Sequence, residues 1–184
     1  MTDDELVRRA QAGDVTAFDQ LVGRHQAAVY RAALAALRSP EDAEEAAQDA
    51  LVRAWTKLAS FRGEASFRTW LLSIAWNRAI SRRRSVTAWF SRRAPIEAAD
   101  RVAGGVSPHQ SMLGGELARH AARAIDALSP KLRDTLLLVQ AGEYGYDDVA
   151  AMLKVPVGTV KWRVSEARRQ VRQRLVGLGC LDGD

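Results

Sequence analysis

Six cations and one tryptophan occur together near the end of the chain, in the stretch GTVKWRVSEARRQVRQRL at residues 158–175. At about 100° per residue, Val160, Val164 and Ala167 fall on one narrow helix face, and Val171 continues that row. Trp162 lies about 160° away from this apolar row, on the side that carries cations. Lys and Arg on a solvated helix face are suited to the phosphates and base edges of DNA. Three uses stay open for the tryptophan: stacking on a partner, a cation–π contact with a neighbouring arginine, or no contact.

Residues suited to catalysis or to metal binding lack the required arrangement. The segments GEYGYDD and AGGVSP have neither the lysine nor the strand context of a phosphate-binding loop. The candidate metal ligands have no ligand spacing with one another: His25, His109, His120 and Cys180. Glu44 and Glu45 form a carboxylate pair, but the sequence implies no histidine or apolar pocket beside them. We therefore expect a protein that is not an enzyme, with no catalytic residue, no metal and no cofactor.

The net charge of +5 hides a block pattern along the chain. Residues 61–95 carry 8 basic and 1 acidic side chains, a net charge of +7, and residues 159–184 carry 6 and 3, a net charge of +3. Residues 1–60 carry 7 basic and 10 acidic side chains, and residues 96–158 carry 6 and 8, so these two segments are net −3 and −2. Two separated cationic blocks predict a nucleic acid that is contacted twice.

Composition and the start of the chain indicate where the protein acts. Hydrophobic residues make up 47% of the chain, a normal share for a globular protein. No apolar run approaches the roughly 20 residues that a membrane span requires. The opening MTDDELVRRA is acidic and lacks the basic start and apolar core of a signal peptide. A single cysteine cannot form an internal disulfide. These features predict a cytoplasmic protein with no membrane insertion of its own.

Helix signals recur along the chain and strand signals are nearly absent, which predicts an all-α protein. Thr2 and Glu5 have the spacing of a capping box, and Gly13 is placed to close the first helix. Side-chain caps are expected at the start of three further helices: Asp14, Ser39 and Ser66. The helix after Ser39 should reach about Leu58, and the helix after Ser66 should reach about Arg84.

The helical periodicity fails from Ser85 to about Met112. The segment RAPIEAADRVAGGVSPHQSM has two Pro and two Gly and few large apolar residues, which is typical of a linker. We expect two small helical domains, a helical bundle at residues 1–86 and a second domain at residues 113–184, joined by a flexible linker at residues 87–112.

The second domain ends in a pattern that predicts a helix-turn-helix. A Ser-Pro helix start occurs at residues 129–130, and helical signals resume with a short helix at Asp147–Leu153. The turn KVPVG and the basic helix follow directly. A short helix, a turn of three or four residues and a basic amphipathic helix have helix-turn-helix spacing.

Two segments of the first domain each allow two interpretations. PEDAEEAAQDALVRAW is either a well-capped helix with a solvated acidic face or a docking surface for a basic partner. In SFRGEASFRTWLLSIAWNRAISRRR, one side is expected to be core: Phe67, Trp70, Leu71 and Ile74. The other side, with Asn77, Arg78 and the arginines at 82–84, matches a nucleic-acid surface. Aromatic rings next to cations also suit single-stranded DNA.

Three motifs in this order resemble the bacterial extracytoplasmic function (ECF) sigma factors of the sigma-70 family. DAEEAAQDALVRAW (42–55) resembles region 2.2 of that family, and FRGEASFRTWLLSIAWNRAISRRR (61–84) resembles regions 2.3 and 2.4. LSPKLRDTLLL and YDDVAAMLKVPVGTVKWRVSEARRQVRQRL resemble region 4. The resemblance covers nearly the whole chain. It implies an alternative sigma factor that binds core RNA polymerase and directs promoter recognition and transcription initiation.

The resemblance also implies roles for individual residues. Four residues would dock on the β′ clamp helices of core RNA polymerase, which also contacts the factor through its β subunit: Asp42, Glu45, Gln48 and Asp49. Because exposed acids contribute little to stability, changing these acids should leave the fold intact. The loop that holds a flipped base of the minus-ten element would be Phe61, Arg62, Gly63, Glu64, Ala65 and Ser66. The adjacent promoter DNA would be followed by Asn77, Arg78, Arg82 and Arg83.

The last helix would lie in the major groove at the minus-thirty-five element. The residues implied there are Thr159, Lys161, Trp162, Arg163, Ser165, Glu166, Arg168 and Arg169. Trp162 stands where many relatives have Ser, so three options stay open for it: an apolar DNA contact, burial under an anti-sigma helix, or idle exposure. Glu166 would accept from a cytosine amino group or hold Arg169 or Arg163 in place.

Relatives of this family are usually held inactive by an anti-sigma factor, so we expect such a partner. With a single cysteine, a redox switch would have to lie in that partner. Two alternatives stay open. One is a sigma-like decoy that binds an anti-sigma partner without directing transcription. The other is a stand-alone helix-turn-helix repressor, against which the acidic segment at 42–49 argues, because a repressor has no need of a polymerase-docking surface.

Overall fold

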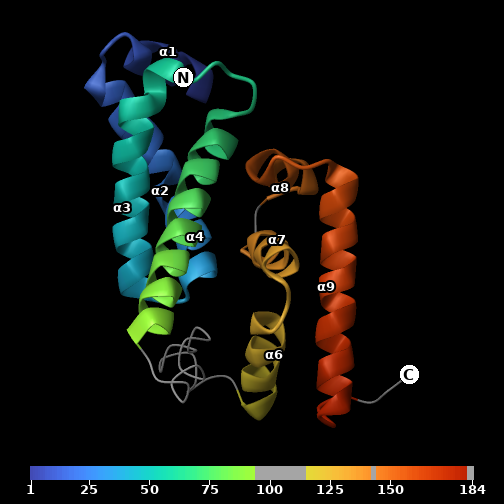
Figure 1. The fold of residues 1–184 in the computed structure, drawn as a ribbon. Helices are drawn as coiled ribbons and strands as arrows, with labels where there is room; N and C mark the ends of the chain where they lie inside the picture. The colour runs from blue at the N-terminus through green and yellow to red at the C-terminus, as the bar shows by residue number, and fades with distance from the viewer. Residues whose placement is uncertain (94–114, 142–143, 182–184) are drawn as a thin grey trace. The chain divides into compact units, whose positions relative to one another are not determined.

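The computed structural model describes residues 1–93, 115–141 and 144–181, with the side chains in these ranges except those of residues 86–93. The regular elements of the described residues are helices (Figure 1). The first half contains α1 (Asp3–Gln11), α2 (Val15–Leu37), α3 (Pro40–Lys57), a single 3-10 turn η1 (Leu58–Ser60) and α4 (Phe67–Arg93). The second half contains α6 (Glu116–Asp126), α7 (Pro130–Gln140), α8 (Tyr146–Leu153) and α9 (Val157–Gly177). The predicted all-α fold class is confirmed.

Predicted helix starts match the structure where a side chain caps the backbone. The capping box of α1 has both its bonds, from the Glu5 amide to Thr2 Oγ1 at 3.3 Å and from the Thr2 amide to Glu5 Oε2 at 2.7 Å. Asp14 Oδ1 accepts from the Ala17 amide at 3.1 Å. Ser39 and Ser66 accept in the same way, from the amides three residues on, at 3.3 and 3.1 Å. These short-range bonds fix where α1 to α4 begin.

Helix α4 is longer than predicted. The expected end was near Arg84, but the helix continues to Arg93 and so includes the first residues of the predicted linker. Residues 85–93 contain neither Gly nor Pro, so no residue in this segment breaks a helix; the first proline is Pro95. Residues 94–112 of the predicted linker lie outside the described residues. By its contacts the chain divides into two units, Met1–Arg83 and Arg84–Asp184.

Small side chains form the contact between α2 and α3. The buried positions of α3 are all alanines: Ala43, Ala46, Ala47, Ala50 and Ala54. Alanines let the axes of two helices approach closely, and α2 and α3 pack along much of their length (Figure 1). Larger buried side chains complete the core of this unit: Leu6, Leu21, Phe67, Leu71, Leu72 and Trp76. Of the predicted core residues of α4, Phe67 and Leu71 are buried, whereas Trp70 and Ile74 are only half-buried.

The second unit packs three short helices against α9. Helices α6, α7 and α8 each contact α9. The predicted apolar row of α9 is buried at Val160, Val164 and Ala167, and Leu175 extends it in place of Val171, which is half-buried. Four leucines of α7 are also buried in this unit: Leu132, Leu136, Leu137 and Leu138. Among the residues described, no helix is both long and apolar enough to cross a membrane.

Candidate functional surfaces

The acidic residues of α3 lie on the side opposite its buried alanines. Asp42, Glu45 and Asp49 follow an i, i+3, i+7 spacing, so their side chains form one row along the helix. Glu45 and Asp49 are exposed and Asp42 is half-buried, and the flanking Gln48 is exposed as well. The structure therefore places all four residues predicted to bind polymerase on one accessible side of α3.

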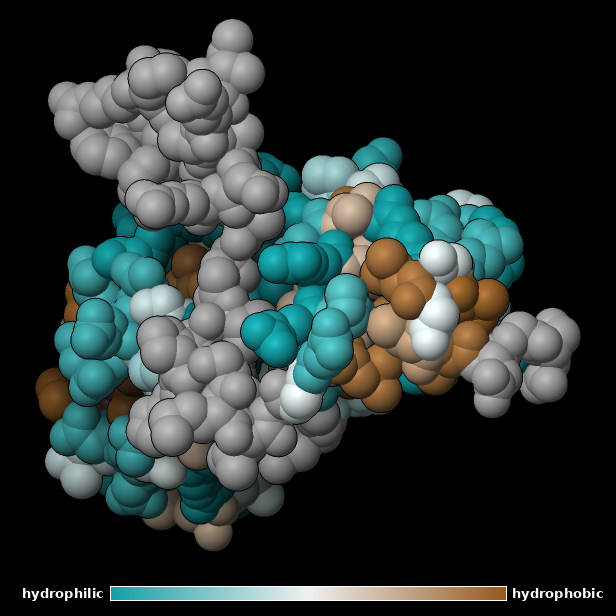
Figure 2. Space-filling view, turned by 90° about the horizontal axis from the view of Figure 1, so that it is seen from below, coloured by the Kyte–Doolittle hydropathy of each residue, from teal (hydrophilic) through white to brown (hydrophobic). Residues whose placement is uncertain are grey.

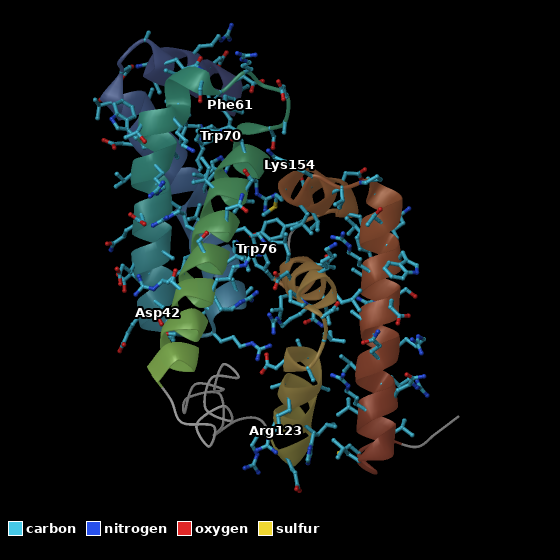
Figure 3. The ribbon with its side chains drawn as sticks, viewed as in Figure 1. Asp42, Phe61, Trp70, Trp76, Arg123 and Lys154 are labelled. Carbon is cyan, nitrogen blue, oxygen red and sulfur yellow. The ribbon has the colours of Figure 1, made fainter. Side chains whose placement is uncertain are left out.

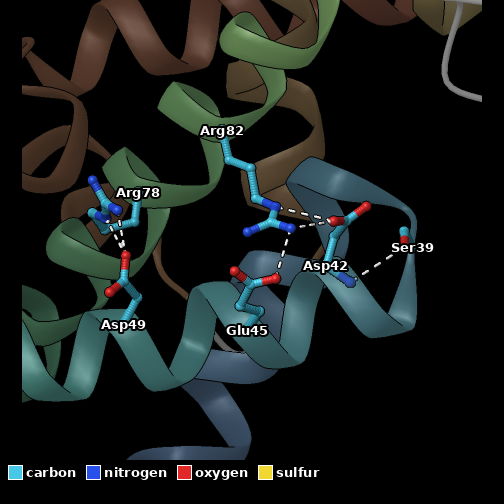
Figure 4. A network of polar contacts seen from close by, with 6 residues as sticks. All are labelled: Ser39, Asp42, Glu45, Asp49, Arg78 and Arg82. Carbon is cyan, nitrogen blue, oxygen red and sulfur yellow. Dashed lines mark hydrogen bonds and ion pairs between the residues drawn. The ribbon is translucent and has the colours of Figure 1, made fainter.

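Arg82 of α4 reaches across to two of these acids (Figure 4). Its Nε and Nη2 both donate to Asp42 Oδ1, at 3.0 and 2.7 Å, and Nη2 also donates to Glu45 Oε2 at 2.7 Å. The bond from Arg82 lowers the pKa of Glu45, and the bonds to Glu45 and Asp42 raise the pKa of Arg82. Each shift favours the charged form of its group, so Glu45 and Arg82 form an ion pair at physiological pH.

A second ion pair joins the same two helices about one turn further along. Arg78 Nε donates to Asp49 Oδ2 at 3.0 Å, and Nη2 of the same arginine also donates to that oxygen. Arg78 and Arg82 are residues predicted to contact DNA, and the acids are residues predicted to contact polymerase. The structure brings these two predicted sites together, so that in the free protein each set neutralises the other.

These pairs are open to competition. All five side chains are partly exposed to solvent, and ion pairs between solvent-exposed groups contribute at most about 1 kcal/mol each. A basic surface of a partner can therefore take over the acids of α3, and a phosphate can take over Arg78 and Arg82. We refer to these pairs, Arg82 with Asp42 and Glu45 and Arg78 with Asp49, as the α3–α4 ion pairs.

The predicted minus-ten loop at residues 61–66 is anchored at one end by an aromatic cluster. The Phe61 ring lies 5.0 Å from Trp70 and 6.0 Å from Phe67, and the Phe67 and Trp70 rings are 5.7 Å apart (Figure 3). Gln11 Nε2 donates to the carbonyl oxygens of Leu58 and Phe61 at 3.0 and 2.9 Å. The start of the loop is therefore held in place beside half-exposed rings, which is an arrangement suited to stacking a base.

The rest of the loop faces solvent. Its exposed residues are Arg62, Gly63, Glu64 and Ser66, and Ala65 is half-buried. Gly63 has a φ of 75°, a left-handed conformation that favours glycine, and there is no atom within 4 Å of the place where a Cβ would sit. Of the remaining predicted minus-ten residues, Asn77 is exposed, while Arg83 Nη1 donates to the Ala36 carbonyl at 3.3 Å and so ties α4 to α2.

The face of α9 opposite its buried row carries the residues predicted for the minus-thirty-five element. Lys161, Trp162, Ser165, Arg168 and Arg169 are exposed, whereas Thr159, Arg163 and Glu166 are half-buried. Trp162 is 63% exposed, compared with 38% for Trp55, the other exposed tryptophan among the described side chains. Glu166 is not free on this face, because it accepts from Arg169 Nε at 2.8 Å, from Arg169 Nη2 at 2.6 Å and from Gln170 Nε2 at 2.7 Å.

Comparisons with known proteins agree with this layout. The family profile described as Sigma-70 region 2 matches residues 21–90, and the profile described as Sigma-70, region 4 matches residues 120–171. The ECF RNA polymerase sigma-E factor of Escherichia coli (strain K12) is 35% identical, over 97% of this chain and 96% of that protein. The chain belongs to the ECF sigma factors of the sigma-70 family. The RNA polymerase sigma-H factor of Pseudomonas aeruginosa is 33% identical over 96% of this sigma factor and 95% of its own length.

Two solved structures resemble this sigma factor along most of its length. CnrH, solved in complex with the cytosolic domain of CnrY, has a TM-score of 0.65 and 28% identity, covering 95% of this chain and 97% of the other. The sigma factor RpoE from Bartonella quintana, solved in complex with the anti-sigma factor NepR, has a TM-score of 0.64 and 27% identity, covering 86% and 96%. Both relatives were thus seen bound to a second protein.

The sequence analysis of this sigma factor missed two residues on the acidic side of α3. Val52 is 63% exposed and Trp55 is 38% exposed, and the Trp55 ring lies 4.9 Å from Phe18. Val52 lies seven residues after Glu45 and so continues the row of acids, and Trp55 follows three residues later at the edge of that row. Neither residue was assigned a role from the sequence, because the docking residues named there were all polar.

A further group of exposed apolar residues lies at the ends of two helices in the second unit of the sigma factor. Leu117 is at the start of α6, and Leu178 and Leu181 follow α9. Figure 2 shows a group of apolar residues on a face whose other coloured residues are largely hydrophilic. The sequence analysis singled out none of these leucines, since they fall outside the predicted DNA-facing stretch.

Proposed function

We propose that this ECF sigma factor gives core RNA polymerase its promoter specificity, and that it does so through three surfaces of its own. The observation that carries the proposal is the presence on one chain of an accessible acidic row on α3, an aromatic-anchored loop beside α4, and a basic recognition helix α9. The chain supplies recognition and the polymerase supplies the chemistry. We also infer two domains, residues 1–86 and 113–184, joined by a linker, with α4 running past the first boundary.

The acidic row of α3 is the proposed docking surface for the basic-flanked β′ clamp helices. Asp42, Glu45, Gln48 and Asp49 supply charge and hydrogen bonds, and Val52 and Trp55 add apolar area at one end of the row. Aromatic residues buried at the centre of an interface contribute much of its binding energy, whereas charges at the rim mainly fix orientation and association rate. The exposure of Val52 and Trp55 supports this extension.

The loop at residues 61–66 is the proposed site for a flipped base of the minus-ten element. The Phe61 and Trp70 rings offer a stacking surface, and the exposed loop residues offer hydrogen-bonding groups to its edge. Asn77, Arg78, Arg82 and Arg83 follow along α4 and would contact the adjacent backbone. Arg78 and Arg82 are paired with acids of α3 in the free protein, so each must release its acid before it can bind a phosphate.

Helix α9 is the proposed reader of the minus-thirty-five element in the major groove. Lys161, Arg168 and Arg169 supply positive charge, and Trp162 supplies an apolar surface suited to a thymine methyl or to the sugar backbone. The exposed fraction of Trp162 supports a role in contacting a partner, because a partner that covers this ring removes its apolar surface from water.

The change Trp162→Ser tests the role of that ring in base recognition. We expect an altered preference at one or two base pairs of the minus-thirty-five region, because only an apolar contact is removed. The salt dependence of binding should stay the same, since no phosphate contact is lost. The free energy of unfolding should change by no more than about 0.5 kcal/mol, as is usual for substitutions at exposed positions. Unchanged base preference with weakened binding to an anti-sigma protein would instead place Trp162 at a protein interface.

An anti-sigma factor is the proposed regulator. The support is the likeness to CnrH, solved with the cytosolic domain of CnrY, and to the sigma factor RpoE of Bartonella quintana, solved with the anti-sigma factor NepR. The exposed leucines at the ends of α6 and α9 are apolar surface that a protein partner could cover. The one cysteine, Cys180, is free, so redox control would have to lie in the partner.

Run-off transcription tests the proposed function directly. The sigma factor is mixed with core RNA polymerase on a library of genomic promoter fragments, and core polymerase alone and the sigma factor alone serve as controls. We expect discrete transcripts that appear only when both components are present. Absence of any promoter-specific product, together with normal binding to an anti-sigma protein, would contradict the proposal and favour the sigma-like decoy.

A further inference from the structure

Both oxygens of the Glu166 carboxylate on α9 accept hydrogen bonds from the same helix. Oε2 accepts from Arg169 Nε at 2.8 Å, and Oε1 accepts from Arg169 Nη2 at 2.6 Å and from Gln170 Nε2 at 2.7 Å. The Arg169 side chain is 55% exposed while that of Glu166 is 21% exposed, so the arginine covers the acid and faces outward. Three of the roughly four acceptor sites of the carboxylate are therefore taken by residues of α9 itself, which leaves little capacity for a base.

The pairing uses one edge of the guanidinium and leaves the other available. A guanidinium has five N–H groups, of which Glu166 takes one on Nε and one on Nη2. Three remain, two on Nη1 and one on Nη2, and one from each of these nitrogens forms the end-on edge of the fork. That edge is the one that can bond both O6 and N7 of a guanine at once. Because Glu166 already holds the guanidinium in place, the Arg169 side chain loses less conformational entropy when this edge binds a guanine.

The position of Arg169 on the helix agrees with base contact. At about 100° per residue it lies within roughly 20° of Trp162 and 40° of Ser165, and both of these are exposed. The three residues therefore form one stripe along the solvent side of α9. Glu166 lies about 60° to one side of the stripe, where its carboxylate can brace Arg169 without occupying the groove-facing line.

We infer that Arg169 determines specificity by reading a guanine end-on in the minus-thirty-five region, and that Glu166 is its positioning residue rather than a reader of cytosine. This inference rests on the proposed function of α9. Bonds from Arg169 and Gln170 lower the pKa of Glu166 to about 2, so the brace stays charged under all conditions in which the factor binds DNA. Among the residues predicted to contact DNA, Glu166 thus acts through Arg169.

A double-mutant cycle on the complete factor tests this assignment. Holoenzyme is assembled from core polymerase and the full chain carrying no change, Glu166→Ala, Arg169→Ala or both. Each holoenzyme selects from a pool of DNA duplexes randomised at the minus-thirty-five region. Base preferences and the salt dependence of binding are then measured on the selected duplexes. Glu116→Ala, on the exposed surface of α6 in the same unit, is the matched control for loss of one negative charge.

We expect the unchanged factor to select a guanine at one position and Arg169→Ala to lose that preference by on the order of tenfold. Glu166→Ala should weaken the same preference at the same position, while Glu116→Ala leaves it intact. In the Arg169→Ala background, Glu166→Ala should change no base preference, because the residue that it braces is gone. Such non-additivity is the signature of a residue that acts through another.

Two results would overturn the inference while leaving the proposed function in place. A uniform loss of affinity for all sequences in Arg169→Ala, with a salt slope smaller by about one, would make Arg169 a phosphate contact. A changed preference for cytosine in Glu166→Ala that persists without Arg169 would make Glu166 a direct reader. Failure of the unchanged holoenzyme to enrich any duplex would instead overturn the proposed function of α9, and this inference with it.

Discussion

Reversing the charge of Asp42, Glu45 and Asp49 to Lys is expected to lower the affinity for core RNA polymerase by on the order of a hundredfold or more. The reversed row would place like charges against the basic clamp helices, and such contacts cost several kcal/mol at an interface. The measurement is a direct binding titration with core polymerase. Glu44→Lys, an exposed acid on the same helix but outside the row, is the matched control. Unchanged affinity of the triple variant would mean that this surface is not the docking site.

The same triple variant should also unfold at a lower temperature, which differs from the expectation drawn from the sequence. The acids had been expected to contribute little because they are exposed. The α3–α4 ion pairs change this, since three new lysines would face Arg78 and Arg82. Neutral changes to Asn and Gln remove the pairs without adding repulsion, so they should destabilise less.

An exchange of charges separates the two effects. Asp49→Arg combined with Arg78→Asp restores an ion pair between α3 and α4 with the opposite orientation. Compared with Asp49→Arg alone, we expect the double variant to have a thermal midpoint closer to that of the unchanged protein. Its affinity for polymerase should stay low, because the docking row still carries a cation. Recovery of both properties would mean that the acid acts only by stabilising the fold.

Trp76→Ala is expected to cost about 3–5 kcal/mol of unfolding free energy, the largest stability change of any single substitution proposed for this protein. Trp76 is 2% exposed and is the largest of the fully buried side chains. Loss of its ring leaves a cavity that neighbouring helices can only partly close. Because domains are stable by only about 5–15 kcal/mol, a large share of the margin would be lost.

Denaturant unfolding followed by far-ultraviolet circular dichroism measures this change. Trp162→Ala, which truncates an exposed tryptophan on the other unit, should alter stability by no more than about 0.5 kcal/mol. Trp76→Phe keeps most of the volume and should fall between the two. A stability of Trp76→Ala within about 1 kcal/mol of the unchanged protein would contradict the assignment of this residue to the core.

Features decided within a few residues could be predicted from the sequence. The caps at Thr2, Asp14, Ser39 and Ser66 join groups only three residues apart, and each forms as expected. The buried row of α9 follows from helical periodicity in the same way. The end of α4 was harder to predict, because loss of apolar periodicity was taken as loss of the helix itself.

Features that depend on how helices pack could not be read from the sequence. Arg82 meets Asp42 and Glu45 across 40 and 37 residues, and Arg78 meets Asp49 across 29 residues. Nothing in the spacing of these residues predicts that α3 and α4 turn these sides toward each other. Trp76 did carry a signal, because Leu72 and Ile80, four residues to either side, are buried with it. The residue types of Val52 and Trp55 gave no corresponding indication that these side chains are exposed.

The α3–α4 ion pairs make two regions of the chain interdependent over evolutionary time. Asp49 and Arg78, and likewise the pair of acids and Arg82, are expected to covary among related sigma factors, since a charge change on one helix is tolerated best when the other follows. If substitutions in α4 change the promoter sequence that is recognised, the matching changes in α3 would also change the affinity for core polymerase. The factor would then compete differently with other sigma factors for a limited amount of polymerase. Attempts to engineer orthogonal promoter recognition in this protein would therefore have to redesign both helices together.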